Sequence, residues 1–163
     1  MLFSSQDLAD FFSQMQKNQR LLGFDLGTKT IGLALSDISW TIASPLETIK
    51  RAKFKKDVER ITTLIKTHNV GGLVIGFPLN MDGTEGPRIQ ATRAFARNLS
   101  AFLPLPILFW DERLSTAVVT RTLLEADASR QRRAEVVDKM AASYILQGAL
   151  DRLSQLENTD DEI

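Results

Sequence analysis

The sequence has 163 residues and no net charge, with 20 Lys and Arg against 20 Asp and Glu. This length suits one domain that buries roughly 70% of the surface of its unfolded chain, and a content of 44% hydrophobic and 25% charged residues is typical of a folded globular protein. Cysteine is absent, which excludes disulfides, thiolate nucleophiles and cysteine-ligated zinc and leaves oxygen atoms as the main metal ligands.

The first predicted element is an amphipathic helix over residues 5–18. Its apolar residues recur at steps of three and four: Leu8, Phe11, Phe12 and Met15. Ser4 and Asp7 resemble the capping pair that opens a helix. Such a helix can pack on its own domain or on a partner. We therefore expect residues 1–18 to form a helical extension that precedes the main domain.

Three strands follow this helix. Apolar runs predict strands over 20–26, 30–36 and 42–48, with a tight turn at Gly27, Thr28 and Lys29 between the first two. The three strands should form a meander. The residues that follow are strongly basic: Lys50, Arg51, Lys53, Lys55 and Lys56. This cluster, like the arginines at 130–133, can meet a phosphate backbone or simply be a solvated helix end.

Helices and strands alternate in the rest of the chain. We expect helices over 54–68, 87–103, 115–126 and 133–155, and buried strands over 70–75 and 107–110. These elements predict an α/β fold in which a mixed five-stranded sheet is flanked by helices, forming one domain over 19–155. The acidic residues 156–163 lack apolar periodicity and predict a flexible tail.

Two features bear on the location of the protein. No apolar stretch approaches the ~18 residues of a membrane span. The N-terminus also lacks the basic and then apolar pattern of a secretory signal. We therefore expect a cytoplasmic protein that does not associate with a membrane.

Three acidic residues stand among apolar ones. Asp25 follows the run 21–24, Glu112 follows the run 107–110, and Asp138 lies on the apolar face of the last predicted helix. Carboxylates brought together in apolar surroundings repel one another unless a cation lies between them. The three acids therefore predict a site for Mg²⁺ or Mn²⁺, which prefer oxygen ligands. Paired ions of this kind assist phosphodiester hydrolysis, which predicts a nuclease.

Each acid also has an ordinary structural explanation. The alternatives are a turn residue at Asp25 and ion pairs for the other two, Glu112 with Arg113 and Asp138 with Arg133 or Arg152. His68 has no second His or Cys partner, so we expect a structural role for it. The large aromatic residues are expected in the core rather than as base-stacking platforms: Trp40, Phe109 and Trp110.

Several residues near the acids are candidates for contact with a phosphate. The glycines of the loop 76–86 let backbone amides approach a ligand, and donors come from Asn80, Thr84 and Arg88. The alternative is a plain structural loop. Lys29 and Arg113 lie next to catalytic candidates in the sequence and could clamp the scissile phosphate or balance the charge of the acids.

The segment Asp25–Thr30 also resembles the DxGT phosphate-binding turn of the actin-like ATPases and sugar kinases. Those enzymes close two domains around a nucleotide, and a single domain of this length has no second half to complete that pocket. A shared ribonuclease H-like core explains the common turn better.

Four segments in order resemble the YqgF family of pre-16S rRNA nucleases, also described as Holliday junction resolvase-like proteins of the ribonuclease H-like superfamily. They are residues 23–32, 76–86, 111–116 and 137–147. The resemblance covers about residues 20–152 and implies a ribonuclease H-like fold. It also implies that Asp25, Glu112 and Asp138 are the metal-binding catalytic acids, with Asp111 a weaker candidate because it points to the opposite face of its strand.

The resemblance further implies a metal-dependent nuclease that matures the 5′ end of pre-16S ribosomal RNA, with RNA and the ribosome as partners and a monomer or homodimer as the active form. One alternative is a resolvase of four-way DNA junctions, which requires a symmetric dimer. Another is a non-catalytic ribosome-assembly factor that binds nucleic acid. The N-terminal helix and the acidic tail lie outside the resemblance and inherit no role from it.

Overall fold

A computed structural model describes residues 1–114 and 130–161, apart from the side chains of 130–139 and 158–161. The predicted helix over 115–126 lies outside the described residues. In the described part of the chain, no helix is long and apolar enough to cross a bilayer.

The centre of the fold is a mixed sheet with the strand order β1-β6-β5-β2-β3-β4. Its strands are β1 (Leu2–Phe3), β2 (Arg20–Leu26), β3 (Thr30–Ser36), β4 (Ala43–Lys50), β5 (Val70–Phe77) and β6 (Ile107–Asp111). β2, β3 and β4 form the predicted antiparallel meander, whereas β5 and β6 run parallel to β2. A buried parallel centre requires apolar side chains on both faces, which explains the continuous apolar runs of β2 and β5.

The sheet has six described strands, so the prediction of five is wrong by one. The additional strand is β1, which pairs in parallel with β6 through Leu2 beside Ile107 and Phe3 beside Leu108. Two residues are too few to produce an alternating apolar pattern, and sequence periodicity therefore could not find this strand.

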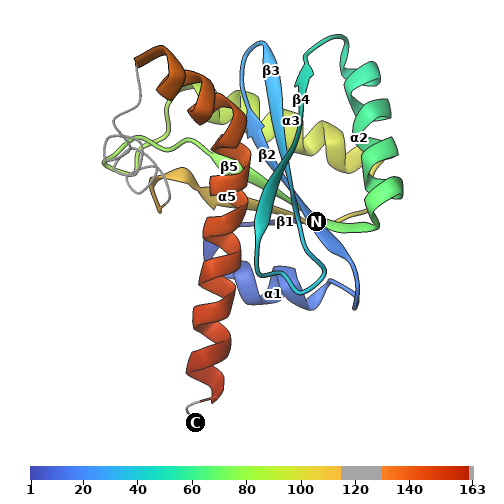
Figure 1. Cartoon of the computed structure of the whole chain (residues 1–163), viewed down its shortest axis with the longest axis vertical. Coiled ribbons are helices and arrows are strands. Elements are labelled where there is room, and N and C mark those ends of the chain that lie inside the picture. The colour runs from blue at the N-terminus through green and yellow to red at the C-terminus, as the bar shows by residue number, and fades with distance from the viewer. Residues whose placement is uncertain (115–129, 162–163) are drawn as a thin grey trace.

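Helices cover both faces of the sheet and give the α/β fold three layers (Figure 1). The helices are α1 (Leu8–Ser13), α2 (Phe54–His68), α3 (Pro87–Phe102) and α5 (Arg130–Asp161). One buried cluster joins α2 and α3 to the first face, and a second joins α1 and α5 to the other face. Successive side chains of β2 point to opposite faces of the sheet. Leu22 and Phe24 therefore belong to the first cluster and Leu21 to the second.

The N-terminal helix is shorter than predicted. A 3-10 turn, η1 (Ser5–Asp7), leads into α1, and the helix ends at Ser13 instead of residue 18. The residues that follow are polar, and Asn18 has a φ of 70° that no continued helix can contain. Leu8, Phe11 and Phe12 are buried in the protein's own core, so this helix packs on the domain.

The last helix is longer than predicted at both ends, since α5 runs from Arg130 to Asp161. The acidic stretch that was expected to form a tail is helical as far as Asp161. Once a helix has formed, each further residue adds one backbone hydrogen bond. The acidic stretch can therefore continue the helix without an apolar face. The central part of α5 packs across β2, β3 and β4.

Candidate functional site

Three parallel strands end at one edge of the sheet, and two of the predicted acids lie there. Asp25 is the penultimate residue of β2, and Glu112 directly follows β6. The strand between them is β5, whose Gly76 pairs with Trp110 of β6. The carboxyl ends of parallel strands are where open α/β sheets bind ligands. The fold therefore brings Asp25 and Glu112, which are 87 positions apart in the sequence, to the same edge.

The carboxylate of Glu112 lies against the backbone of Gly76. A Cβ atom on Gly76 would lie 2.7 Å from Glu112 Oε1 and 2.6 Å from Ile145 Cδ1. Real side chains do not approach so closely, so a Cβ atom at this position would force the end of the Glu112 or the Ile145 side chain to shift. Because Ile145 belongs to α5, the same contact places Glu112 on the face of the sheet that α5 covers.

The charge of Asp25 acts on the ionisation of Glu112. The pKa of Glu112 is raised to about 7, chiefly by burial and next by the negative charge of Asp25, while Arg88 lowers it. Asp111 contributes a smaller increase. Partly buried carboxylates that repel one another in this way form an oxygen-only site that fits a hard divalent cation.

The third predicted acid, Asp138, lies in the first part of α5, where the backbone is helical and the side chains are outside the described ones. Its position relative to Asp25 and Glu112 therefore stays a prediction. Among the side chains that the structure does describe, no group of three His, Asp or Glu residues gathers around a potential metal position.

Arg88 is a predicted phosphate contact that lies close enough to Glu112 to lower its pKa. It is the second residue of α3, and its Nη2 donates a hydrogen bond of 2.6 Å to the carbonyl oxygen of Leu26. Leu26 is the residue that directly follows Asp25. This bond holds the guanidinium beside the acids. Because Arg88 is exposed, the guanidinium also retains access to solvent.

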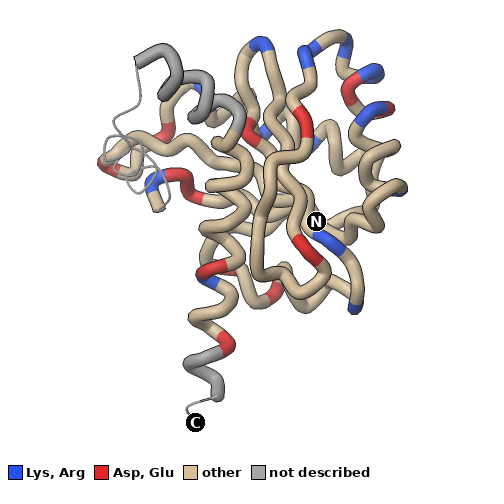
Figure 2. The backbone as a smooth tube through the Cα atoms, viewed as in Figure 1, with Lys and Arg blue, Asp and Glu red and all other residues tan. Residues whose placement is uncertain are grey.

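Lys29 lies on the exposed turn between β2 and β3, at the same end of the sheet. Arg51 braces this turn, because its Nη1 donates to the carbonyl of Gly27 over 2.7 Å and its backbone N–H donates to the carbonyl of Lys29 over 2.9 Å. Figure 2 shows Lys and Arg gathered on this turn and on the connection from β4 to α2. The sequence identified Arg51 only as one of a basic cluster, and its role in holding the turn depends on the pairing of β3 with β4.

Asn80 and Thr84 bond to one another inside their exposed loop. Asn80 Nδ2 donates to Thr84 Oγ1 over 3.0 Å, and Thr84 donates to Asp82 Oδ1 from its hydroxyl over 2.6 Å and from its backbone over 3.0 Å. These bonds lower the pKa of Asp82. The described contacts of both side chains are therefore those of a well-ordered loop, and contact with a ligand stays a prediction.

Arg113 pairs with Asp111, whereas the sequence suggests Glu112 as a partner. Its Nη2 donates to Asp111 Oδ2 over 2.6 Å and its Nε donates to Oδ1 over 3.0 Å. This pairing lowers the pKa of Asp111. Gly83, with a φ of 88°, turns the preceding loop back so that it approaches Arg113 Nη1. Arg113 is thus neutralised on the far side of β6 from Glu112.

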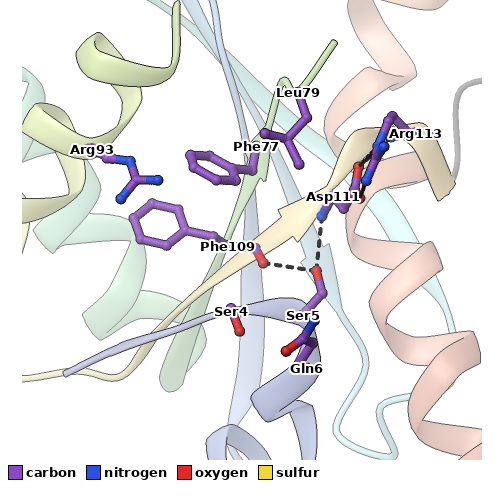
Figure 3. A pocket seen from close by; sticks show the side chains of 9 residues that line it. All are labelled: Ser4, Ser5, Gln6, Phe77, Leu79, Arg93, Phe109, Asp111 and Arg113. Atoms are coloured by element: carbon purple, nitrogen blue, oxygen red, sulfur yellow. Dashed lines mark hydrogen bonds and ion pairs between the residues drawn. The ribbon is translucent and has the colours of Figure 1, made fainter. Parts of the chain in front are cut away.

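A pocket beside these strand ends was not predicted from the sequence. It lies on the α3 side of β5 and β6, and its walls include Phe77, Arg93, Phe109 and Asp111 (Figure 3). The alternation of β6 offered a signal, because Phe109 and Asp111 must share one face of the strand. No pattern in the sequence identified Arg93, which comes from the separate helix α3.

The chain is similar to a group of known proteins. The family described as "RuvX: Holliday junction resolvase" matches residues 19–152. A protein of Methylocella silvestris is 61% identical over 151 residues, which is 93% of this chain and 94% of that protein. A protein of Paramagnetospirillum magneticum is 61% identical over 146 residues, which is 90% of this chain and 94% of that protein. Both are named "Putative pre-16S rRNA nuclease".

Two solved structures share the fold at low sequence identity. The yeast mitochondrial Holliday junction resolvase Ydc2 has a TM-score of 0.56 and 12% identity, over 94% of this chain and 86% of that one. Thermus thermophilus RuvC in complex with a Holliday junction substrate has a TM-score of 0.52 and 12% identity, over 83% of this chain and 96% of that one. By its family match and its relatives, supported by this RuvC-like, ribonuclease H-like fold, the chain belongs to the RuvX family.

Proposed function

We propose that this protein is a divalent-metal-dependent nuclease that hydrolyses phosphodiester bonds in RNA. The observation that carries the proposal is the meeting of Asp25 and Glu112 at the carboxyl ends of β2 and β6, across Gly76. Two carboxylates held together in partly buried surroundings, in a chain without cysteine, fit Mg²⁺ or Mn²⁺. Asp138 is the proposed third ligand.

In this proposal the acidic residues bind the cation and the basic residues contact the substrate. Asp25, Glu112 and Asp138 hold the cation, which when bound supplies Lewis-acid stabilisation of the charge that develops on the phosphodiester. Arg88, fixed on the Leu26 carbonyl, contacts a phosphate oxygen beside the acids. Lys29 contacts the backbone further along the strand.

Three further residues belong to the proposed substrate-binding surface. Asn80 and Thr84 order the loop after β5, and they are proposed to present their remaining hydrogen-bonding capacity to the sugar-phosphate chain. Arg113, which is neutralised by Asp111, offers guanidinium N–H groups to a substrate atom rather than a free charge.

The proposed substrate is the precursor of 16S ribosomal RNA, cut during maturation of its 5′ end. The names of the two relatives that are 61% identical support this choice. The reaction would then take place in the cytoplasm, on precursor RNA that is free or associated with the ribosome, by a monomer or a homodimer.

A second candidate activity is the resolution of four-way DNA junctions. The description of the matched family favours it, and it requires a symmetric dimer that makes paired cuts. A third candidate, a binding factor without turnover, is less favoured because Asp25 and Glu112 are both present and adjacent.

One assay separates the three candidates. The protein is incubated with Mg²⁺, with Mn²⁺ or with a chelator, and is offered precursor ribosomal RNA, generic single-stranded RNA and a four-way DNA junction side by side. We expect metal-dependent cutting of the precursor RNA. Preferred cutting of the junction would support the resolvase, and tight binding without cutting of any substrate would support the binding factor and overturn the proposal.

A further inference from the structure

The pocket beside the candidate site has the size and composition of a ligand site. Its volume is about 410 Å³, within the range of roughly 300–1,000 Å³ that is usual for pockets of small molecules. Its walls come from β5, β6, α3, the loop after β5 and the N-terminal segment (Figure 3). Apart from Arg113, no residue that lines this pocket has a role in the proposed phosphodiester chemistry.

Two aromatic rings form one wall. The centroids of the Phe77 and Phe109 rings lie 5.1 Å apart with an angle of 35° between the ring planes, and both residues are only partly buried. The guanidinium of Arg93 lies 5.2 Å from the Phe77 centroid, in cation–π contact. The expectation that Phe109 is a core residue is therefore incomplete, because it packs against the core and also lines the pocket.

The cations of the pocket are already neutralised. Arg93 forms an ion pair with Glu85, and Arg113 forms one with Asp111 over 2.6 Å. The side chains of Ser4 and Gln6 add uncharged hydrogen-bonding groups (Figure 3). A wall of aromatic rings, several hydrogen-bonding groups and little net charge suit an uncharged, planar and polar ring, and suit a phosphate poorly.

The pocket and the acids lie on opposite faces of the same two strand ends. Phe77 follows Gly76, which contacts Glu112, and Asp111 immediately precedes Glu112. Successive residues of a strand point to opposite faces, so one step along β5 or β6 leads from the acids to the pocket. A nucleic-acid strand that crosses this edge can thus place its backbone at the acids and an adjacent base in the pocket.

The N-terminal segment closes the pocket through Ser5. The Ser5 hydroxyl donates to the carbonyl oxygen of Phe109 over 3.1 Å and accepts from the backbone N–H of Asp111 over 3.0 Å. These two bonds fix the segment against β6, beyond the two residues of β1. The wall that carries Ser4 and Gln6 precedes the family match, which begins at residue 19.

We propose that this pocket binds one unpaired nucleobase of the substrate, stacked on Phe77 and Phe109, next to the phosphate at the acids. Single-stranded RNA is recognised in this way by aromatic residues and arginine. The proposal rests on the proposed nuclease function and adds to it that the strand is single at the site of cutting. A base within a duplex is stacked and paired and cannot enter.

The test measures binding without cutting. Fluorescence anisotropy in a chelating buffer gives the Kd of the full chain for a short single-stranded RNA, and for a series of the same RNA with one base at a time removed. Stacking of one base predicts that removal at a single position weakens binding between about five- and a hundredfold. We expect this sensitivity to vanish in Phe77→Leu and to weaken in Arg93→Gln.

Matched controls lie on the same helix as Arg93. Phe102→Leu removes an aromatic ring that is 62% exposed, and Arg97→Gln removes one exposed charge. Both controls should keep the position-specific loss of wild type. Thermal unfolding identifies any variant that fails to fold, and Arg93→Gln, which alters an exposed side chain, then carries the test in place of Phe77→Leu.

The outcomes separate this proposal from the nuclease function. Equal affinity for every RNA of the series, absence of binding, or sensitivity that persists in folded Phe77→Leu and Arg93→Gln would overturn the base pocket, even if the metal-dependent assay shows cutting. Conversely, a sensitivity to base removal that depends on both Phe77 and Arg93 supports the base pocket. This holds even if the metal-dependent assay shows no cutting, a result that would overturn the nuclease function.

Discussion

The carboxylate of Glu112 occupies the space where a side chain at Gly76 would begin, with Glu112 Oε1 2.7 Å from the position of a Cβ atom. Gly76→Ala should therefore displace Glu112 from Asp25 and reduce cutting by at least about tenfold, as for the loss of a contact that orients a metal ligand. The same Cβ would also press on Ile145 Cδ1 and destabilise the protein.

The double variant Gly76→Ala, Ile145→Val separates these two effects. Valine lacks Cδ1, so the melting temperature should recover toward the wild-type value while cutting stays low. Recovery of both properties together would show that the position of Glu112 does not matter.

Asp25→Asn and Glu112→Gln should each reduce cutting by more than about a hundredfold, which exceeds the usual cost of losing a group that only supports a metal ligand. Binding of RNA in a chelating buffer should be kept or slightly strengthened, because each change removes a negative charge that repels the phosphates of the substrate. The controls Asp10→Asn and Glu59→Gln remove one exposed carboxylate each and should cut like wild type. Cutting by Asp25→Asn at the wild-type rate would contradict the assignment.

Stability of the metal-free protein should depend on pH through Glu112. Its pKa is about 7 in the folded state against an ordinary value of 4.5, so the folded state binds its proton more tightly than the unfolded state. The stabilisation is complete below pH 4.5 and is lost as pH rises toward about 7, up to about 3 kcal/mol in all. Urea unfolding of wild type and Glu112→Gln between pH 4 and pH 8 measures this difference.

Added Mg²⁺ should reverse that trend, because a cation binds the ionised carboxylate. The free energy of unfolding of wild type at pH 8 should rise with Mg²⁺, and that of Glu112→Gln should rise much less. An equal response of the two proteins would place the cation away from Glu112.

Arg88→Gln should weaken substrate binding and leave the fold intact, since Arg88 is exposed and its described bond goes to one backbone carbonyl, that of Leu26. Loss of a charge-assisted contact predicts an increase in KM of about tenfold or more, corresponding to about 1.5–3 kcal/mol. Arg97→Gln, on the same helix, is the control. An unchanged KM together with a reduced kcat would assign Arg88 to the acids rather than to the substrate.

Lys29→Gln should weaken RNA binding by a similar factor for every sequence, because a backbone contact carries no base information. Loss of one phosphate contact should reduce the slope of log K against log salt concentration by about 0.7 for a single strand. Lys17→Gln removes a charge from the polar residues after α1 and should leave the slope unchanged. Binding titrations over a range of salt concentrations measure both.

The fold could be predicted largely because its strong elements are long and periodic. β2, β3 and α2 have the bounds that the apolar patterns predicted. Local patterns do not report short pairings such as β1 with β6, nor how far a polar helix such as α5 continues.

The types of residue at the candidate site could be predicted from the sequence, but the contacts between their side chains could not. An acid at the end of an apolar strand is visible in the sequence, so the positions of Asp25 and Glu112 at the strand ends could be predicted, and their catalytic role stays a prediction. The partner of Arg113 depends on which face of β6 each neighbour occupies, and the choice of Asp111 over Glu112 is a product of that geometry. Arg93 of α3 stacks on Phe77 of β5. Residue spacing in the sequence cannot predict a contact between a helix and a separate strand.

The bridge from Ser5 to Phe109 and Asp111 has a practical consequence. Backbone groups along the outer edge of β6 are covered by β1 and then by this hydroxyl, which leaves little for a strand of another molecule to pair with. A truncated protein that starts at Gln19 would uncover that edge together with the apolar surface beneath Phe11 and Phe12. Such a protein should self-associate on storage, so the first eighteen residues are best retained in any crystallisation or engineering work.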